Sequence, residues 1–381
     1  MGFNPIEGLL YAALKTIRFF DKRDRDVLRF NPDAVKKILV VSSTALGDTL
    51  LSTPAVRAVR RRYPKSLIIA CFNKDNMELF SNNPHIDGVI AFHGGYKKFW
   101  SAVKELKKFK FDLALILHGN EPQATPLCYL SGARFIFKLP NDSRYNFLLS
   151  NRTPVLGWVD LGHGIEARLK TAALAGCKAI DPRMELFVHA ELEEEVDGFL
   201  KGEGVIGGAP LIGFQPGAST KSRMWFADRF IELGKRLVKD IPGVRIALTG
   251  SPAEKPLCDC IAEGIGPGAL CAAGRIDLTG LPSLIKRFSV FVTGDTGPMH
   301  IAYTTGTPVV ALYAVSDPGR TGPFYSQERH RVIKKDRTCD PCVSKKCEYQ
   351  KCMEYITVDE VDEAVKELLC LPSNVSIGGR R

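Results

Sequence analysis

Short apolar runs alternate with longer amphipathic stretches along most of this chain. In the first half, the apolar runs predict four buried strands, at Lys37–Ser42, Ser66–Cys71, Gly88–Phe92 and Asp112–Leu117. Apolar residues at helical spacing between these runs predict two helices, at Leu50–Arg62 and Phe99–Phe109. Strands that alternate with helices indicate a mostly parallel sheet with right-handed crossovers.

The alternation starts again after an acidic and then glycine-rich segment at residues 191–208, which we expect to be a linker. Beyond it, the predicted strands are Leu211–Gln215, Val244–Thr249, Val290–Thr293 and Pro308–Tyr313, and the predicted helices are Phe226–Val238 and Thr357–Leu369. The pattern therefore predicts an α/β protein with two successive sheets. We expect an N-terminal extension over residues 1–36, a first domain over 37–190, a second domain over 209–356, and a C-terminal helix and tail over 357–381.

The N-terminal extension has the pattern of an amphipathic basic helix. Its apolar residues recur at helical spacing, at Ile6, Leu9, Leu10, Ala13, Leu14, Ile17 and Phe20. Its positive charge comes from Lys15, Arg18, Lys22, Arg23 and Arg25. Such a helix either packs on its own protein or lies on an anionic membrane surface, and the sequence leaves both interpretations open.

Composition narrows the class of protein. A chain of 381 residues with 45% hydrophobic and 25% charged residues suits a soluble protein of two domains. Its net charge of +10 favours an anionic partner, such as nucleic acid, phospholipid, or a phosphorylated or carboxylated substrate. No apolar run reaches the ~18 residues of a membrane span and no signal-peptide layout is present, so we expect a cytoplasmic location. In that compartment, the 11 cysteines favour thiols or metal ligands over disulfides.

The first loop with candidate chemistry follows the first predicted strand. It reads SSTALGDT at residues 42–49, and ligands of open α/β sheets bind at such strand ends. Gly47 permits a tight turn, and Asp48 begins the following helix. The plain alternative is that Asp48 serves only as the N-cap of that helix. The loop lacks the pattern G-x-G-x-x-G, which argues against an ordinary NAD site.

Two loops of the second half have the features of anion sites. Residues 294–300, GDTGPMH, follow a predicted strand; Pro298 suits the first turn of the next helix, with Asp295 or Thr296 as its cap. The free N–H groups at such a helix start favour phosphate. Residues 215–225, QPGASTKSRMW, offer small residues, hydroxyls and two cations before a helix. The respective alternatives are a simple strand–turn–helix junction and a flexible basic loop.

Four stretches taken together resemble glycosyltransferase family 9, whose best-known members are the lipopolysaccharide core heptosyltransferases. They are ILVVSSTALGDTLLSTPAVRAVRRRYP, FQPGASTKSRMWFADRF, FVTGDTGPMHIAYTTGTPVVALY, and SDPGRTGPF with the cysteine run after it, and they span residues 38–358. The resemblance implies a GT-B fold, in which two Rossmann-like domains with parallel sheets face each other across a cleft. It also implies an inverting, metal-independent transfer that needs no cofactor.

The resemblance assigns the acceptor to the N-terminal domain and the nucleotide sugar to the C-terminal domain. Asp48 is implied as the general base, and the acceptor side comprises Thr44, Gly47, Thr49 and His118. The implied donor side comprises Ser219, Thr220, Arg223, Glu254, Asp295, Thr296, Gly297 and His300. Arg223 departs from the lysine that family members often have, and its guanidinium holds phosphate by a planar fork instead of a point charge.

The implied partners are ADP-heptose as donor and an anionic lipid-linked saccharide, the lipopolysaccharide inner core, as acceptor. They place the enzyme in the cytoplasm, peripheral on the inner face of the cytoplasmic membrane. Another nucleotide-sugar transferase of the same family and a GT-B nucleotide-sugar epimerase are the alternatives. We expect no nucleic-acid partner, because no recognition helix, aromatic platform or RNP-like motif accompanies the positive charge.

A run of four cysteines follows the second domain's last predicted strand, at Cys339, Cys342, Cys347 and Cys352. Thiolates at such spacing can hold Zn²⁺, but zinc sites more often have two C-x-x-C pairs and only one is present. We therefore expect packed free thiols in preference to a structural metal or a disulfide.

Overall fold

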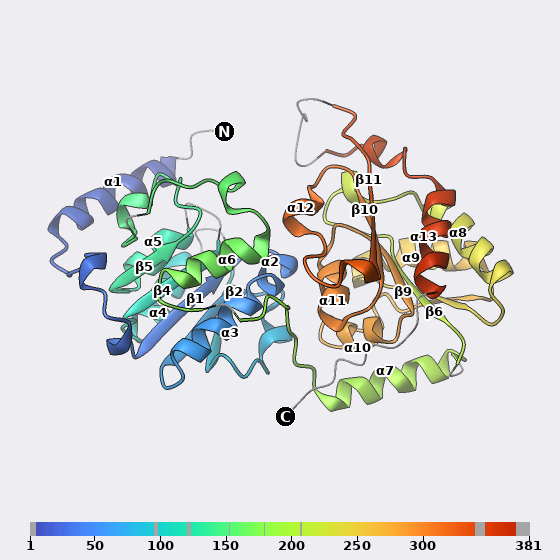
Figure 1. The fold of residues 1–381 in the computed structure, drawn as a ribbon, viewed down its shortest axis with the longest axis horizontal. Helices are drawn as coiled ribbons and strands as arrows, with labels where there is room; N and C mark the ends of the chain where they lie inside the picture. Colours follow the sequence, from blue (N-terminus) through green and yellow to red (C-terminus); the bar gives the residue numbers. More distant parts are fainter. Residues whose placement is uncertain are drawn as a thin grey trace. The chain divides into compact units, whose positions relative to one another are not determined.

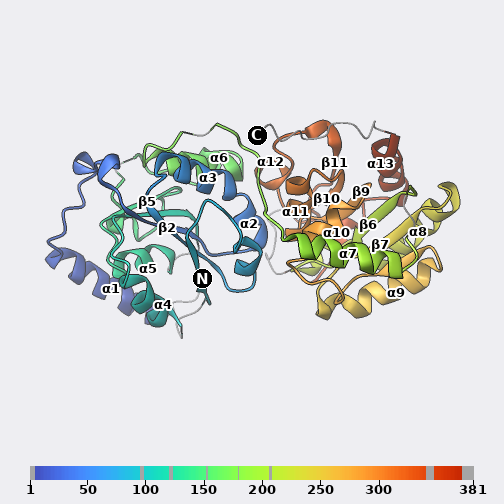
Figure 2. The same ribbon diagram turned by 90° about the horizontal axis from the view of Figure 1, so that it is seen from below.

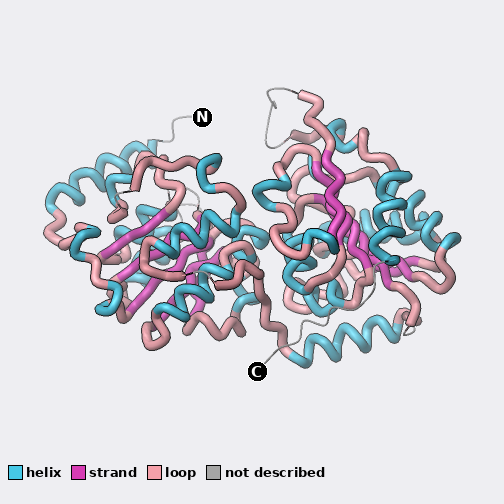
Figure 3. The backbone as a smooth tube through the Cα atoms, viewed as in Figure 1, coloured by secondary structure: helices cyan, strands magenta, loops and turns pink. Residues whose placement is uncertain are grey.

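The computed structural model describes residues 5–94, 98–119, 123–151, 153–178, 180–205, 208–339 and 347–370. The chain divides into two compact units, Met1–Phe187 and Val188–Arg381, and each is built around its own parallel sheet (Figure 1, Figure 3). The predicted class, an α/β protein with two sheets, is confirmed.

In the described residues, the sheet of the first unit has parallel strands in the order β3-β2-β1-β4-β5. Their bounds are Lys37–Ser42 for β1, Leu67–Asn73 for β2, Gly88–Phe92 for β3, Leu113–His118 for β4 and Phe135–Lys138 for β5. The four predicted strands are present, and β1 and β3 have the predicted bounds. We did not predict β5, because a run of four residues that ends in lysine is a weak apolar signal.

Helices cover both faces of this sheet. Those in the described residues are α1 Pro5–Phe20, α2 Leu46–Leu50, α3 Thr53–Arg62, α4 Phe99–Lys107, α5 Ala124–Leu130 and α6 Gly164–Ala173. Figure 2 shows α3 and α6 on one face and α1, α4 and α5 on the other. Helix α1 buries Leu10 and Leu14 in the same core as residues of α4 and α5, so one face of the N-terminal helix packs on the unit.

The helix predicted over Leu50–Arg62 is present as α3, which begins three residues later, at Thr53, and the separate short helix α2 precedes it. Pro54 lies in the first turn of α3 and has no N–H to donate to the carbonyl of Leu50. Thr53 Oγ1 donates to that carbonyl instead, at 2.8 Å. Helix α2 therefore ends at Leu50, and α3 begins at Thr53.

The described sheet of the second unit has the order β11-β10-β9-β6-β7-β8. Its strands are β6 Leu211–Gln215, β7 Arg245–Leu248, β8 Ala269–Cys271, β9 Val290–Gly294, β10 Val309–Tyr313 and β11 His330–Lys334. The sequence did not predict β8 and β11. The first has only three residues, and the second is an edge strand whose side chains alternate between buried and accessible.

The described helices of the second unit are α7 Ala190–Gly202, α8 Ala227–Asp240, α9 Lys255–Ile265, α10 Leu281–Lys286, α11 Gly297–Thr305, α12 Pro318–Thr321 and α13 Val358–Cys370. The larger part of the expected linker at 191–208 is therefore helix α7. Arg287 Nε, next to α10, donates to Asp197 of α7 at 2.8 Å, which ties the segment to the second unit. Helix α13 packs on α8 and contributes Val361, Val365 and Leu368 to the core of this unit.

Candidate active site

Strand order fixes where a ligand can bind in the first unit. Strand β1 lies between β2 and β4, so the loops that follow β1 and β4 leave the sheet on either side of a topological switch point. Ser42, the last residue of β1, pairs with His118, the last residue of β4. The N–H of Ser43 also donates to the carbonyl of His118, over 3.1 Å. The loop at 42–49 and His118 therefore meet where open α/β sheets bind ligands.

Asp48 projects its carboxylate from the first turn of α2. The helix begins at Leu46 with Ala45 as N-cap, and Asp48 is its third residue, so the interpretation of Asp48 as the N-cap is wrong. The side chain of Asp48 is 27% exposed, and its Oδ2 accepts a hydrogen bond from Thr44 Oγ1 at 2.8 Å. A carboxylate in this turn is favoured by the helix dipole.

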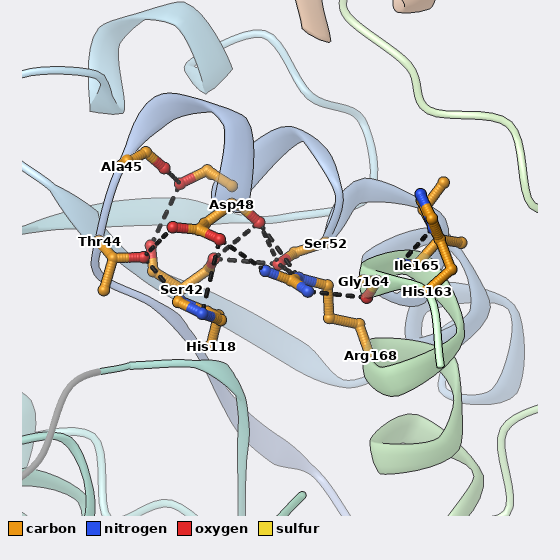
Figure 4. Close-up of polar contacts among 11 residues, drawn as sticks. Ser42, Thr44, Ala45, Asp48, Ser52, His118, His163, Gly164, Ile165 and Arg168 are labelled. Carbon is orange, nitrogen blue, oxygen red and sulfur yellow. Dashed lines mark hydrogen bonds and ion pairs between the residues drawn. The ribbon is translucent and has the colours of Figure 1, made fainter. Parts of the chain in front are cut away.

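Thr44 and His118 complete a hydrogen-bonded group with Asp48. Thr44 Oγ1 lies 2.6 Å from His118 Nδ1, and His118 Nε2 lies 3.5 Å from Asp48 Oδ1 (Figure 4). Since Thr44 gives its one hydroxyl proton to Asp48, the short contact requires a proton on Nδ1 of His118. The ring of Trp158 lies 5.2 Å from the ring of His118. The structure thus brings together three of the residues predicted for this site.

Sequence reasoning missed a fourth member of this group, Arg168 of α6. Its side chain is only 2% exposed, and Nη2 donates to Asp48 Oδ1 at 3.0 Å (Figure 4). A weak signal was present in the sequence: Arg168 lies at helical spacing from Ile165 and Ala172, and the structure buries all three on one face of α6. A charged side chain is almost never fully buried without a partner, so an arginine there indicates an acidic group opposite it.

Asp48, Thr44 and His118 border a hollow of about 530 Å³ in the first unit. The rest of its described lining is Ser43, Ala45, Asn73, Phe92, His93, Gly94 and Gln123. Gly47 and Thr49, predicted on the acceptor side, are buried in α2 and are not among these residues. Thr49 Oγ1 donates to the carbonyl of Ser42 at 3.3 Å, so it shapes the turn.

The second unit repeats this arrangement. Strand β6 lies between β7 and β9, so the loops after β6 and β9, which we predicted as anion sites, flank a second switch point. Arg223, from the loop after β6, has Nη1 3.5 Å from Oδ2 of Asp295, which follows β9. The side chain of Asp295 is 9% exposed and that of Arg223 is 38% exposed. The buried carboxylate of Asp295 therefore lies beside the guanidinium of Arg223, which remains partly accessible.

Two glycines allow these loops to approach closely. A Cβ on Gly294 would lie 2.5 Å from the carbonyl oxygen of Arg223, and a Cβ on Gly217 would lie 1.9 Å from Oε1 of Glu254. Both distances are below the 3.0 Å that real Cβ atoms keep, so neither site accepts a side chain without displacement. Glu254 also accepts from the N–H of Ser251 at 2.7 Å, which fixes its carboxylate against the loop after β6.

Helix α11 starts directly after Asp295 and presents its free N–H groups at the same switch point. Of the two candidate caps, Thr296 caps the helix, and its Oγ1 accepts from the N–H of Met299 at 3.4 Å. Gly297 is the first residue of the helix and Pro298 follows in the first turn, as predicted. A helix start of this kind favours a phosphate.

The remaining donor-side residues differ in accessibility. Ser219 is exposed, and Thr220 Oγ1 lies 3.2 Å from Ser222 Oγ. His300 is buried, with its ring 6.1 Å from that of Tyr303. Ser219 and Thr220 are therefore available to a ligand in the loop after β6, whereas His300 lies within the unit.

The cysteine run is only partly described, because Cys342 lies outside the described residues. Cys339, Cys347 and Cys352 are free thiols, and Cys339 is exposed, so the expected packing is wrong for this residue. Among the residues that the structure describes, no group of three His, Cys, Asp or Glu side chains is placed to hold a metal ion.

Comparison with known proteins identifies relatives over most of the chain. A family model described as glycosyltransferase family 9 (heptosyltransferase) matches residues 99–353. The lipopolysaccharide core heptosyltransferase OpsX of Haemophilus influenzae is 27% identical over 305 residues, which cover 77% of this chain and 83% of the relative. Lipopolysaccharide heptosyltransferase 1 of Pseudomonas aeruginosa is 25% identical over 335 residues, with 82% and 88% covered.

Solved structures share the fold. A glycosyl transferase family 9 protein from Veillonella parvula aligns with a TM-score of 0.74 at 22% identity, covering 88% of this chain and 97% of that protein. The ADP-heptose lipopolysaccharide heptosyltransferase II of Escherichia coli aligns with a TM-score of 0.69 at 24% identity, covering 87% and 98%. The two parallel-sheet α/β units are thus those of GT-B heptosyltransferases.

Proposed function

The chain belongs to glycosyltransferase family 9, and from this membership we propose that it transfers a heptose from ADP-heptose to the inner core of lipopolysaccharide. The relatives of H. influenzae and P. aeruginosa are named lipopolysaccharide heptosyltransferases, and they align with 77% and 82% of the chain. The donor follows from the name of the E. coli structure, an ADP-heptose heptosyltransferase.

The observation that carries the proposal is the carboxylate of Asp48 at the edge of the hollow in the first unit. In the proposed reaction, the acceptor hydroxyl oxygen bonds to the anomeric carbon while the bond from that carbon to the diphosphate oxygen breaks. Asp48 takes the hydroxyl proton, and ADP leaves with the electron pair. Attack from the face opposite ADP inverts the anomeric configuration.

The second unit supplies groups that suit the leaving diphosphate. Arg223 is held beside the start of α11, and Ser219 and Thr220 are accessible in the same loop. Cationic and N–H donors aimed at a developing phosphate charge stabilise it in the transition state. These groups support a metal-independent transfer, and we assign Glu254 and Asp295 to contacts with the rest of the nucleotide sugar.

Transfer to defined acceptors tests this function. The full chain is mixed with ADP-heptose and with lipopolysaccharide truncated either before or after its first heptose, and the product is analysed by mass spectrometry. A heptose added to one of the two acceptors, with equimolar ADP released, is the expected result, and the acceptor used separates a first from a second addition. Transfer from a different nucleotide sugar alone, or conversion of ADP-heptose to an epimer without transfer, would contradict the proposal.

We also propose that the enzyme lies on the membrane that carries its acceptor, through the outer side of α1. No helix among the described residues is long and apolar enough to cross a bilayer. The outer side of α1 nevertheless exposes Leu9 by 73%, Phe19 by 83% and Phe20 by 72%. Lys15, Arg18 and Lys22 lie in or next to the same helix. Exposed apolar side chains flanked by cations are typical of helices that lie on anionic membranes.

Vesicle flotation tests the membrane proposal. The double variant Phe19→Ser/Phe20→Ser is expected to float with anionic vesicles less than wild type does, and added salt is expected to reduce wild-type binding because the cations contribute. Tyr355→Ser removes an aromatic that is 60% exposed in the second unit and serves as the control. Equal flotation of wild type and the double variant would show that α1 only braces its own domain.

A further inference from the structure

The guanidinium of Arg168 is bound on every side by the segment that carries Asp48 and by its own helix. Nε donates to the carbonyl of Asp48 at 3.3 Å and to Ser52 Oγ at 3.1 Å. Nη1 donates to the carbonyl of Gly164 at 2.7 Å, and Nη2 donates to Asp48 Oδ1 at 3.0 Å. Ser52 in turn donates to the carbonyl of Asp48 at 2.8 Å. Arg168 therefore donates hydrogen bonds to both the main-chain carbonyl and the carboxylate of Asp48.

Removal of an arginine from water is costly unless its charge and its N–H groups are matched. A brace between α6 and α2 needs no charge, since an apolar side chain on the buried face of α6 packs as well. The carboxylate that matches this charge belongs to Asp48, which borders the hollow and is 27% exposed. The buried cation is therefore directed at the carboxylate that borders the hollow.

From this geometry we infer that Arg168 is a positioning residue, which locks the Asp48 carboxylate in one orientation and keeps it ionised as a proton acceptor. With Oδ1 held by Arg168, rotation of the carboxylate is blocked, and Oδ2 stays toward Thr44 and the hollow. The inference rests on the proposed function, because it assigns Asp48 the role of base.

The other groups that face Asp48 cannot supply a constant charge. His118 lies 3.5 Å from the same Oδ1, and His93 lines the hollow from the end of β3. Imidazoles change charge near neutral pH, whereas a guanidinium keeps its charge throughout the range in which enzymes work. Arg168 is therefore the group beside Asp48 that carries a constant positive charge.

Three variants of the full chain test this inference. Arg168→Gln removes the charge, Arg168→Lys keeps the charge but not the fork, and Arg25→Gln is the matched control. Arg25 is a buried arginine of the same unit that lies 3.8 Å from Asp21 and donates to the carbonyl of Leu148. For each, kcat and both KM values are measured against pH, and thermal unfolding is followed in parallel. The carboxyl carbon of Asp48 is titrated by NMR, with its signal assigned from Asp48→Asn.

The expected loss of kcat is about 10²-fold for Arg168→Gln and smaller for Arg168→Lys, with donor KM unchanged, since misplacement by 1 Å costs about that much. The Asp48 signal and the acid limb of the rate are expected to move up by about one pH unit or more in Arg168→Gln. Arg25→Gln is expected to lower the unfolding temperature and to leave kcat and the titration of Asp48 unchanged. If Arg168→Gln does not fold, kcat and the Asp48 titration of Arg168→Lys are compared with those of wild type and Arg25→Gln instead.

The outcomes separate this inference from the proposed function. An unchanged Asp48 titration together with an unchanged kcat in the Arg168 variants overturns the inference. An equal loss of kcat in Arg25→Gln reduces Arg168 to a structural brace and overturns it too. A shifted Asp48 titration in a protein whose wild type transfers no sugar supports the positioning of Asp48 and refutes the function instead.

Discussion

Replacement of Asp48 tests the candidate base and its ion pair in one experiment. Asp48→Asn keeps the size of the side chain but removes its charge and its ability to take a proton. We expect the transfer rate to fall by about 10²–10⁴, which is the usual contribution of a general base. We also expect a loss of stability, because Arg168 is 2% exposed and the change removes the carboxylate charge that lies 3.0 Å from its Nη2.

The size of that loss follows from the burial of the two partners. Breaking a fully buried ion pair costs about 3–5 kcal/mol. The Asp48 side chain is 27% exposed and the amide oxygen of Asn can still accept from Arg168, so we expect about 1–2 kcal/mol for Asp48→Asn. Asp48→Ala removes the acceptor as well, and we expect about 2–3 kcal/mol. For a unit the size of Met1–Phe187, each kcal/mol lowers the unfolding temperature by about 2–4 °C.

Thermal unfolding and ADP release are measured on the same preparations. Asp33→Asn is the control, because Asp33 pairs with Arg62 but is 81% exposed, and such surface pairs contribute about 0–1 kcal/mol. A variant Asp48→Asn that unfolds at the wild-type temperature would show that the Arg168 contact contributes nothing to stability. One that also retains the wild-type rate would refute the role of Asp48 as base.

Three further predictions concern the second unit. Arg223→Ala and Asp295→Ala are each expected to weaken ADP binding by about 1.5–3 kcal/mol in calorimetry, and unchanged affinity in both would place the donor elsewhere. Gly294→Ala is expected to displace the carbonyl of Arg223 and to weaken ADP binding. The control Gly198→Ala, whose Cβ would meet no atom within 4 Å, is expected to leave ADP binding unchanged. Equal ADP affinities of the two variants would refute the steric argument. Burial lowers the pKa of His330 from 6.5 in the unfolded chain to about 3 in the folded protein. The neutral imidazole therefore contributes its full share of the free energy of unfolding above pH 6.5, and this share is lost as the pH falls toward 3. Denaturant unfolding of His330→Phe should therefore lose less stability over that range than wild type, and parallel curves would contradict this.

The sequence was sufficient for most of the fold because buried parallel strands are continuous apolar runs. β1, β3 and β6 have the predicted bounds. The missed strands β8 and β11 lie at the two edges of their sheet, where a short or half-polar strand has no such run. The start of α3 was predicted three residues early, at Leu50, although Pro54 in its first turn marks the true start at Thr53.

The site was predicted in part. Thr44, Asp48 and His118 come together because they follow adjacent strands, and strand ends can be predicted from apolar runs. Arg168 comes from a helix 120 positions away from Asp48, and no local pattern records which buried carboxylate a buried arginine meets. Thr49 is buried, whereas Thr44 borders the hollow. This difference depends on how the first turn of α2 is oriented, which the sequence pattern does not show.

The division of the chain at Phe187 also bears on how such enzymes diverge. Asp48, His118 and Arg168 belong to the first unit and its core, whereas Arg223 and Asp295 belong to the second. Mutations that reshape the hollow around His93 and Gln123 therefore alter the first unit and leave the core of the second unit unchanged. Under the proposed assignment of the acceptor to the first unit, a lineage can change its acceptor by mutations in that unit, or by recombination near residue 187, and keep the loops of the second unit unchanged.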